Sequence, residues 1–554
     1  METTQVLDGV RFADMIQGGY ANLLTQASRI NDLNVFPIPD GDTGDNMLLT
    51  MLGGVDAGKA PQESISDASR KIADGMLLSA RGNSGVILSQ FFDGIAAGFE
   101  GIEQADSEQV GNALRCGVSH AYKAVLKPTE GTVLTVAREA TEYACTQNAK
   151  TPYELIQEFL VEARRTLDKT PEMLPVLKKA GVVDSGGAGL ICIVEGMAMA
   201  LNGEKPATGD APVVANTQGA TQEIDISLFD ENSVLEFGYC TELLLRLQTA
   251  KTDINNFDIT VITDYLQQIG DSVAAFKTGT IVKIHVHTMT PDKALSYCQQ
   301  YGEFLKIKIE NMSLQHNNSV LSENDNNGDE AEDEIREHTD FGIVAVCSGE
   351  GVSELFTERG ADIIVSGGQS MNPSAEDFID AFKKVNADTI FVLPNNSNII
   401  LAARQAASMF TESDVRVIES RTIGDGFAAL SMYDTYSGDA DIIESELNDA
   451  MVGVVTAEVS QAVRDSGEVH TGEYIGFIGK DILVSEPSRF DTACKTMDKI
   501  GIDQADLCLI IYGNSANTEE ALQIQEYVNN KYPGKDTYIY EGRQDIYDYI
   551  IILQ

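Results

Sequence analysis

The 554-residue sequence has no tryptophan, only six histidines and no run of basic residues. Its 39 Lys and Arg face 85 Asp and Glu, which gives a formal net charge of −46. A field of this sign repels polyanions, so the composition excludes nucleic acid and anionic membrane surfaces as general partners. No apolar stretch approaches the roughly 20 residues that span a bilayer, which predicts that the protein is not an integral membrane protein.

Cysteine pairs and a leader segment are also lacking. The eight cysteines are scattered without any C-x-x-C spacing, so no disulfide framework is expected. Residues 1–11 contain neither the basic nor the apolar region of a signal peptide. Together these features predict a reduced, cytoplasmic protein, and the length predicts several domains.

Two segments lack the hydrophobic periodicity of folded elements. Residues 202–225 are rich in Gly, Pro, Ala, Thr and Gln, which predicts a linker. Residues 323–340 hold nine acidic residues and one Arg, so self-repulsion predicts a disordered or very mobile linker over 317–340. The domains expected between them are residues 1–201, 226–316 and 341–554.

The three blocks differ in periodicity. In the first, apolar residues recur at spacings of three and four, as over 12–24 and 67–79, which predicts an all-α domain. The third alternates β-branched runs with helical patterns, which is typical of an α/β domain with a parallel sheet. Its runs are residues 341–346, 361–365, 387–393 and 505–512. The middle block mixes both signals and predicts an α+β domain.

An aspartate loop carries the strongest chemical signal. In Asn34–Met47 (NVFPIPDGDTGDNM), prolines stiffen the approach and glycines permit a tight turn, so Asp40, Asp42 and Asp45 can converge. Hard carboxylate ligands of this kind suit Mg²⁺ together with substrate phosphates. The alternative is that these carboxylates only cap the helix that follows. The segment alone leaves both interpretations open.

Three further Gly/Ser/Thr turns precede helical patterns in the first block, at residues 80–85, 127–132 and 183–189. Their backbone N–H groups and hydroxyls could bind phosphate oxygens at helix N-termini, or could serve only as helix caps. A P-loop-like run, residues 53–60, is rejected because Ala60 replaces the required Ser or Thr and no strand precedes it.

These segments carry a resemblance. Residues 34–47, 80–90 (ARGNSGVILSQ), 127–136 (KPTEGTVLTV) and 181–190 (GVVDSGGAGL) resemble the signature segments of the dihydroxyacetone-kinase nucleotide-binding family. Together with 237–242 (FGYCTE), 282–287 (VKIHVH) and 366–373 (SGGQSMNP), they make nearly the whole chain similar to the A subunits of bacterial fatty acid kinases.

The resemblance implies that the N-terminal domain is a helical barrel that binds ATP and two Mg²⁺ ions. It makes Asp40 and Asp42 metal ligands, with Asn34 a weaker candidate ligand or orienter. The role of Asp45 stays open, because close relatives usually have Thr there. The residues expected to line the nucleotide are Thr43, Asn46, Ser84, Gly85, Thr132, Asp184, Ser185 and Gly186.

The middle block holds a candidate zinc site. His285 and His287 are two apart in a strand pattern and so share one face, and Cys240 lies in a second short strand pattern with Glu242 as a further candidate. An isolated H-x-H pair is otherwise more often hydrogen-bonded or on the surface. The resemblance implies that Cys240, His285 and His287 bind Zn²⁺, in a structural or positioning role.

The third block resembles the DegV-like fatty-acid-binding fold. Its turns at 366–369 and 394–398 are expected at strand carboxyl ends, where open α/β sheets place ligands. A docking surface for a partner protein is the interpretation favoured for them, with turn and cap formation as the alternative. Ser374 and Asp377 have nearly the spacing of a capping box.

The function predicted from these features is ATP-dependent phosphorylation of the carboxylate of a fatty acid, presented by a separate fatty-acid-binding protein of the DegV family. Arg81 would either stabilise the transition state or form a surface ion pair. The alternatives are a kinase for a small polyol of the dihydroxyacetone type and a non-catalytic nucleotide-binding regulator. A homodimer is left open.

Overall fold

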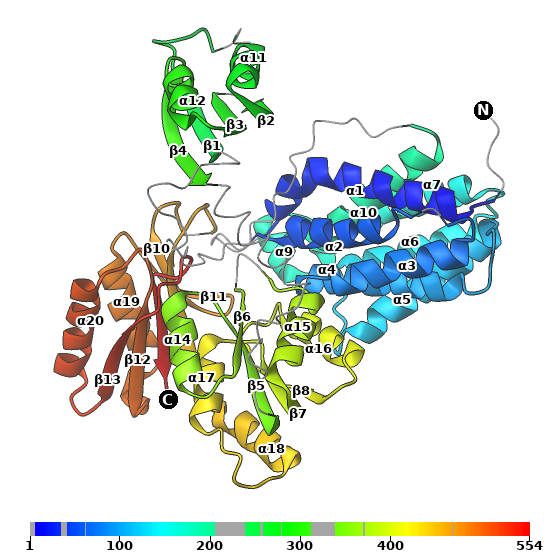
Figure 1. The fold of residues 1–554 in the computed structure, drawn as a ribbon. Coiled ribbons are helices and arrows are strands. Elements are labelled where there is room, and N and C mark those ends of the chain that lie inside the picture. The colour runs from blue at the N-terminus through cyan, green and yellow to red at the C-terminus, as the bar shows by residue number, and fades with distance from the viewer. Residues whose placement is uncertain are drawn as a thin grey trace, which may run out of the picture. The chain divides into compact units, whose positions relative to one another are not determined.

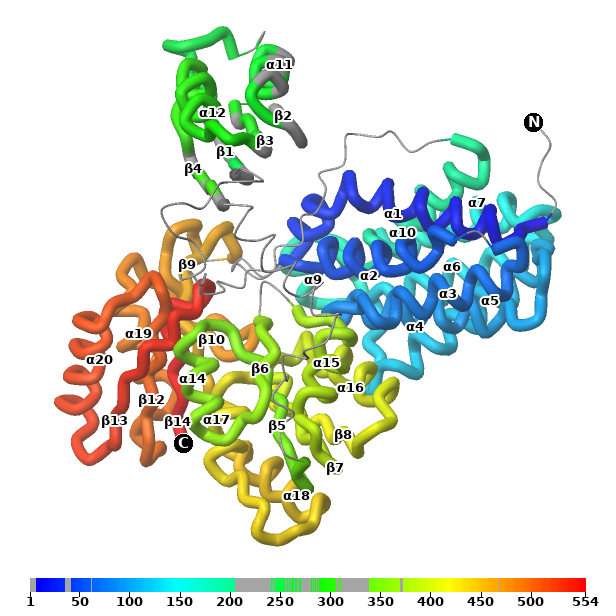
Figure 2. The backbone as a smooth tube through the Cα atoms, viewed as in Figure 1, coloured from blue at the N-terminus to red at the C-terminus, as the bar shows by residue number. Residues whose placement is uncertain are grey.

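The computed structural model describes residues 6–34, 41–60, 62–204, 239–254, 257, 259–278, 280–311, 338–368, 372–467 and 469–554. The chain forms two compact units, one of residues 1–213 and 336–554 and the other of residues 214–335. The first unit therefore contains both ends of the chain, and the second is the middle of the sequence (Figures 1 and 2). The predicted linkers, 202–225 and 317–340, lie mostly outside the described residues.

The N-terminal part of the first unit is all-α, as predicted. Its helices are α1 (Gly9–Asn31), α2 (Thr43–Ala57), α3 (Ile65–Leu78), α4 (Gly82–Gly98), α5 (Ser107–Ala124), α6 (Val133–Thr146), α7 (Pro152–Leu167), α8 (Thr170–Met173), α9 (Pro175–Ala180) and α10 (Ser185–Leu201). The apolar residues spaced three and four apart in α1, such as Phe12, Met15 and Ile16, enter one core shared by the long helices. α1 packs lengthwise against both α10 and α2 (Figure 2).

The C-terminal part is the predicted α/β domain. Its elements are β5 (Thr339–Cys347), α14 (Glu350–Glu358), β6 (Ile363–Ser366), α15 (Ala375–Val385), β7 (Ala387–Leu393), α16 (Ile400–Met409), β8 (Asp414–Val417), α17 (Ile423–Ser431), α18 (Ala440–Ala450), β9 (Val455–Gln461), β10 (Tyr474–Ile478), β11 (Asp481–Glu486), α19 (Arg489–Lys499), η2 (Ile502–Gln504), β12 (Leu507–Tyr512), α20 (Thr518–Lys531), β13 (Asp536–Glu541) and β14 (Tyr549–Leu553).

These strands form two sheets. The four-stranded sheet has the order β6-β5-β7-β8, and its neighbours all run parallel. The six-stranded sheet has the order β11-β10-β9-β14-β12-β13 and is mixed, with β12 parallel to β13 and the other pairs antiparallel. The turns expected at strand carboxyl ends do follow β6 and β7 directly (Figure 1).

The N-terminal and C-terminal parts share a core. Ala80 and Val86, from the segment around the start of α4, are buried in the same cluster as Phe378 of α15 and Ala402 of α16. Gln405 of α16 adds polar links, because its amide donates to the Leu77 carbonyl and accepts at 3.1 Å from Gln90. This docking brings the carboxyl ends of β6 and β7 toward the aspartate loop.

The middle unit is α+β, as predicted. Its elements are β1 (Tyr239–Leu247), α11 (Thr260–Ile269), β2 (Gly270–Thr278), β3 (Ile281–Thr288), α12 (Pro291–Cys298) and β4 (Gly302–Asn311). The sheet order is β2-β3-β1-β4, and every pair is antiparallel. The backbone register places Cys240 opposite His287 and Glu242 opposite His285. The side chains of these four residues lie outside the described part of the structure.

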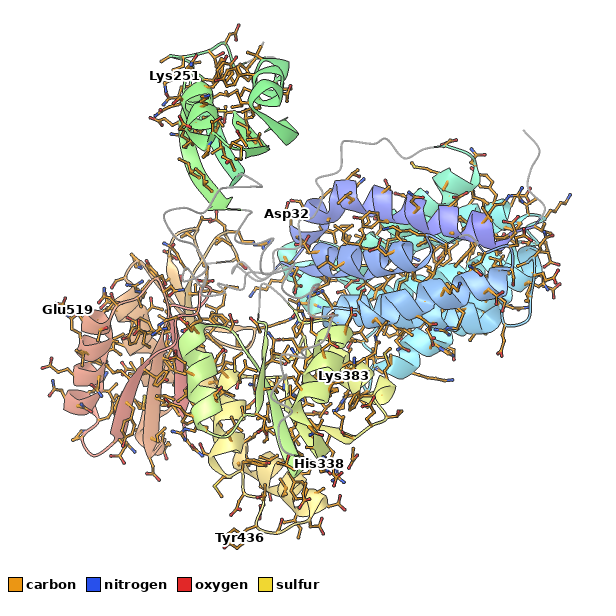
Figure 3. All side chains as sticks on the ribbon, in the orientation of Figure 1. Asp32, Lys251, His338, Lys383, Tyr436 and Glu519 are labelled. Carbon is orange, nitrogen blue, oxygen red and sulfur yellow. The ribbon has the colours of Figure 1, made fainter. Side chains whose placement is uncertain are left out.

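Exposed polar side chains are found on helices and loops of the first unit. Lys383 of α15 and Glu519 of α20 project from helix surfaces, and Tyr436, on the loop before α18, is 96% exposed (Figure 3). Among the described residues, no helix is both long enough and apolar enough to cross a membrane.

Candidate functional site

Four helix N-termini from the N-terminal part meet at one place. The Ser185 hydroxyl, at the start of α10, donates to Thr43 Oγ1, at the start of α2, over 3.2 Å. Gly82 begins α4 with φ of +55°, and a Cβ at this glycine would lie 2.5 Å from Asn46 Nδ2 in the first turn of α2. Helix N-termini carry partial positive charge and unsatisfied N–H groups, so their convergence makes an anion-binding surface.

Asp184 ties the fourth N-terminus into this group. Its carboxylate accepts from the Gly187 N–H at 2.7 Å and also from the backbone of Val133, where α6 begins. Burial raises the pKa of Asp184 to about 6, against the lowering effect of these two bonds. Asp184 is therefore a helix cap of α10, and Ser185 and Gly186 lie in the first turn of that helix.

Thr132 precedes α6 as its N-cap residue without a side-chain cap bond. Its hydroxyl donates instead to the Thr129 carbonyl at 2.8 Å, within the predicted turn. The backbone N–H groups at the start of α6 are therefore not satisfied by this threonine.

Asp42 differs from Asp184. It precedes α2 as the N-cap residue, yet its side chain makes no cap bond, so the helix-cap interpretation is wrong for this residue. One carboxylate oxygen, Oδ2, accepts from the Asn372 side-chain amide and, over 3.2 Å, from that of Asn398. Burial raises the pKa of the Asp42 carboxyl, while the amides of Asn46 and Asn372 oppose the shift.

Of the other two carboxylates of the aspartate loop, the structure describes that of Asp45. Asp45 accepts from the Asn31 amide at 2.9 Å, which is a local bond between α1 and α2. Asp40 lies outside the described residues. The Asn34 carbonyl accepts at 2.7 Å from Arg464, which follows β9.

The turn before α4 lies between the two parts of the unit. Gly85 packs its backbone against the Thr50 hydroxyl of α2, at a separation that leaves no room for a Cβ. Arg81 donates to the Asn372 carbonyl at 2.8 Å, and a second guanidinium nitrogen lies 3.6 Å from Asp377. Asp377 also completes a capping box with Ser374, as its spacing indicated.

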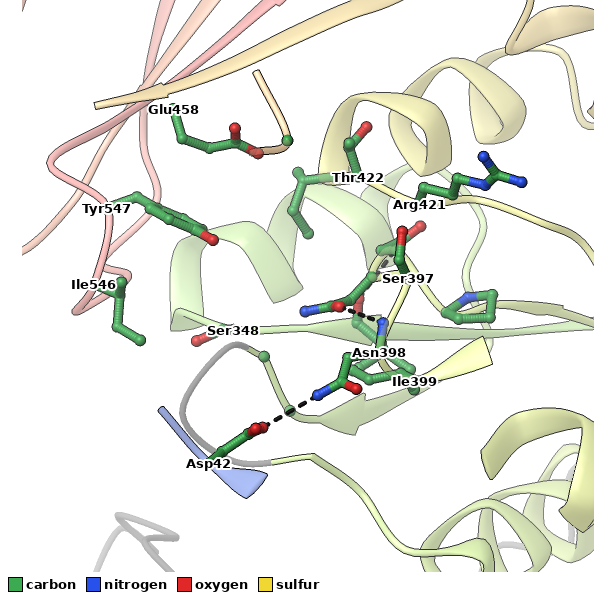
Figure 4. A pocket seen from close by; sticks show the side chains of 18 of the residues that line it. Asp42, Ser348, Ser397, Asn398, Ile399, Arg421, Thr422, Glu458, Ile546 and Tyr547 are labelled. Atoms are coloured by element: carbon green, nitrogen blue, oxygen red, sulfur yellow. Dashed lines mark hydrogen bonds between the residues drawn. The ribbon is translucent and has the colours of Figure 1, made fainter. Parts of the chain in front are cut away.

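A pocket of about 380 Å³ opens between these elements (Figure 4). From the N-terminal part it is lined by Asn34, Asp42, Thr43, Asn83 and Ser84. The C-terminal part contributes the two strand-end turns, residues 367–368 and 394–398. Sequence patterns placed these turns at strand ends but associated them with partner docking, whereas here they line the same pocket as Asp42.

Glu458 of β9 lines the same pocket, across it from Asp42 in Figure 4. Its buried oxygen Oε2 has no hydrogen-bond partner. Burial, with a smaller contribution from the charge of Asp425, raises the pKa of Glu458 to about 8. No sequence motif marked this residue, because a single Glu in a β-strand carries no pattern.

The residues at this site fit a nucleotide and a hard divalent cation. The converging N-termini offer donors for phosphate oxygens, and the Asp42 carboxylate is an oxygen ligand of the kind Mg²⁺ prefers. The amide oxygen of Asn372, which is 2% exposed, has no hydrogen-bond partner beside that carboxylate. Among the side chains that the structure describes, no group of three or more His, Cys, Asp or Glu is placed to hold a metal ion, and Asp42 is the described carboxylate that this site offers to a cation.

Each of the three parts of the chain matches the model of a known domain family. Residues 37–199 match the DAK2 domain model. Residues 236–319 match the middle domain of the FakA-like fatty acid kinases, and residues 342–554 match the C-terminal domain of the same FakA-like family.

Relatives match over the full length. Protein YloV of Bacillus subtilis is 38% identical over 555 residues, which cover 99% of both chains. An uncharacterized protein of Staphylococcus haemolyticus is 36% identical over 556 residues, again covering 99% of each.

Solved structures show weaker likeness. The Streptococcus pneumoniae fatty acid kinase B3 protein loaded with linoleic acid matches 39% of this chain and 99% of its own, at 11% identity and a TM-score of 0.29. The dihydroxyacetone kinase of C. freundii matches 34% of this chain and 33% of its own, at 20% identity and a TM-score of 0.28.

Proposed function

This chain belongs to the FakA-like fatty acid kinase family, and from that premise we propose that it transfers the γ-phosphoryl group of ATP to the carboxylate of a fatty acid. The fatty acid is presented by a separate DegV-type fatty-acid-binding protein. A carboxylate oxygen forms a new bond to phosphorus, the bond to the β-phosphate oxygen breaks, and the products are acyl phosphate and ADP. No proton is taken up or released in this exchange.

The observation that carries the proposal is the position of Asp42 among four helix N-termini. The starts of α2, α4, α6 and α10 supply donors for the phosphates, with the hydroxyls of Thr43, Ser84, Thr132 and Ser185 close to them. Asp42 and Asp40 would hold Mg²⁺, and Asn34 lines the same pocket as Asp42. Magnesium, when bound, neutralises charge on the transferred phosphoryl group.

The acceptor requires no general base. A fatty-acid carboxylate is already ionised at neutral pH, so catalysis reduces to alignment and charge neutralisation. The described residues that line the pocket include no histidine.

A zinc ion in the middle unit is a second part of the proposal. The register of β1 and β3 supports it, because Cys240 and His287 are direct cross-strand partners. His285 is two residues from His287 on β3 and completes the proposed set. Its role is structural, since the phosphoryl-transfer residues all belong to the other unit.

Turnover by the full-length protein tests the function. Purified protein is mixed with Mg²⁺, ATP and an acyl-loaded DegV-type binding protein, and ADP and hydroxylamine-trapped acyl phosphate are measured. We expect turnover that depends on the loaded partner. Equal turnover of free fatty acid would refute delivery by a partner, and phosphorylation of dihydroxyacetone instead would identify a polyol kinase. Nucleotide binding without any turnover would indicate a regulator.

Asp42→Asn tests the assignment of the carboxylate. The substitution preserves shape but removes the charge, so we expect kcat to fall by roughly 10²-fold or more. Asp56→Asn is the matched control, because Asp56 lies on the same helix, does not line the pocket and forms an exposed ion pair with Lys59. Equal activity of the two variants would exclude Asp42 from the metal site.

A further inference from the structure

Two asparagines reach the aspartate loop from the far end of the sequence. Asn372 donates from its side-chain amide to Asp42 Oδ2, and Asn398 donates to the same oxygen over 3.2 Å. They follow β6 and β7 and are separated from Asp42 by 330 and 356 positions. The described residues thus show Asp42 held by side chains from the C-terminal part of the unit.

Each asparagine is anchored on its other side. Asn398 Oδ1 accepts from the Asn83 N–H at 2.9 Å, so this residue bridges Asp42 and the first turn of α4. The Asn372 backbone carbonyl accepts from Arg81 at 2.8 Å. These bonds orient both amide groups toward the carboxylate, and Arg81 acts on the site through Asn372.

The Asn372 amide also has an unused acceptor. Its oxygen is buried without a hydrogen-bond partner, while its nitrogen bonds the carboxylate. A buried carbonyl oxygen beside a carboxylate is a favourable neighbour for a cation or for a water molecule bound to one. A buried acceptor without a partner costs free energy. A cation or its bound water at this place would satisfy the Asn372 oxygen and remove that cost.

We propose that Asn372 and Asn398 are positioning residues of the magnesium–nucleotide site, which is therefore built from both the N-terminal and the C-terminal parts of the chain. This inference rests on the proposed function. The two amides fix the orientation of Asp42, and the Asn372 oxygen adds an acceptor beside the cation. An intact C-terminal part is then a requirement for cation and nucleotide affinity, in addition to any role in partner docking.

Gln405 provides a matched control for the interface. Its amide also links the two parts, through the Leu77 carbonyl and Gln90, but it does not contact the aspartate loop. Gln405→Ala removes hydrogen bonds between the two parts but no hydrogen bond to Asp42, and the buried apolar contacts between the parts remain. A loss of Mg²⁺ affinity in the asparagine variants that Gln405→Ala does not share therefore arises from the contacts with Asp42.

The experiment measures binding by the full-length protein. The Kd of ADP is determined by calorimetry as Mg²⁺ is varied, and Mn²⁺ binding is followed by electron paramagnetic resonance. We expect Asn372→Ala plus Asn398→Ala to raise the Mg²⁺ concentration for half-saturation by roughly tenfold, since hydrogen bonds to a charged group are worth at least that much. Gln405→Ala leaves it unchanged. Asn398→Ala alone, at a partly exposed turn, gives a smaller rise and serves if the double variant does not fold.

Three results would overturn the inference. The Mg²⁺ concentration for half-saturation could be unchanged in the asparagine variants, or it could rise equally in Gln405→Ala. It could also fall in the asparagine variants, which would mean that the amides obstruct cation binding at Asp42. Each of these leaves nucleotide binding by the unaltered protein intact. Failure of the unaltered protein to bind Mg²⁺ and ADP would instead refute the proposed function.

Discussion

Asp42 and Glu458 line one pocket but have different surroundings. Asp42 accepts hydrogen bonds from amide groups, which favour its charged form and oppose the effect of burial. Glu458 has a buried oxygen without a partner and faces the like charge of Asp425. Burial still leaves the pKa of the Asp42 carboxyl above its ordinary value, whereas the Glu458 carboxyl, with a pKa of about 8, is protonated at neutral pH.

Glu458 predicts a pH dependence of stability. Its pKa is about 8 in the folded protein, above the ordinary 4.5, so between these values the folded state binds one more proton than the unfolded state. Stability contributed by this group is therefore fully present below pH ~4.5, falls as pH rises, and levels off above pH ~8. We expect Glu458→Gln to flatten the fall of Tm between pH 5 and 8.

Glu519→Gln, on the exposed surface of α20, is the control and should leave the Tm profile unchanged. Thermal unfolding at a series of pH values provides the measurement. Parallel Tm profiles for Glu458→Gln and the unaltered protein would contradict the assigned pKa.

At the scale of elements, the crossing of α1 and α10 positions two of the loops that form the site. Gly18 and Gly196 let the backbones of these helices approach closely, and a Cβ at Gly18 would lie 2.5 Å from the Gly196 carbonyl oxygen. It would also lie 2.7 Å from Ala200 Cβ. The contact involves backbone on one side, so it cannot be relieved by rotating a side chain.

Gly18→Ala should therefore destabilise the protein, although alanine favours helices. Forcing the crossing apart is expected to lower the free energy of unfolding by about 1–3 kcal/mol. Gln17→Ala, at the adjacent exposed position of α1, should stay within about 0.5 kcal/mol of the unaltered protein. Denaturant unfolding of both variants checks this, and a more stable Gly18→Ala would show that α1 and α10 do not pack in this way.

At the scale of the whole molecule, the chain leaves its first unit, forms the middle unit and returns. The proposed zinc site belongs entirely to the middle unit. We expect elemental analysis of the intact protein to find zinc, and Cys240→Ala or His287→Ala to remove it while ADP binding persists, because the nucleotide residues lie in the other unit.

His338→Ala is the control, since His338 is exposed beside Asp388, outside the middle unit. This variant should retain its zinc. Protein prepared without chelators that contains no zinc would refute the site, and undiminished zinc in both the cysteine and histidine variants would show that other residues bind it.

Local patterns were sufficient for much of the fold. Apolar spacing in α1 and α3 and the β-branched runs of β5, β6, β7 and β12 predicted these elements, because periodicity and end signals act within a few residues. The capping box at Ser374 was visible for the same reason. The three Gly/Ser/Thr turns did prove to precede helices, and two of these helix N-termini meet α2 directly.

The sequence by itself thus determined the periodic helices and strands named above, the helix starts after the Gly/Ser/Thr turns and the family resemblance. Only the tertiary structure decided which loops meet. Asn372 and Asn398 reach Asp42 because Ala80 and Val86 are buried against α15 and α16, a packing between segments about 300 residues apart that no local pattern encodes. The same packing turned Arg81 toward Asn372, and it made Asp42 an acceptor for two amides where the local pattern equally allowed a helix cap.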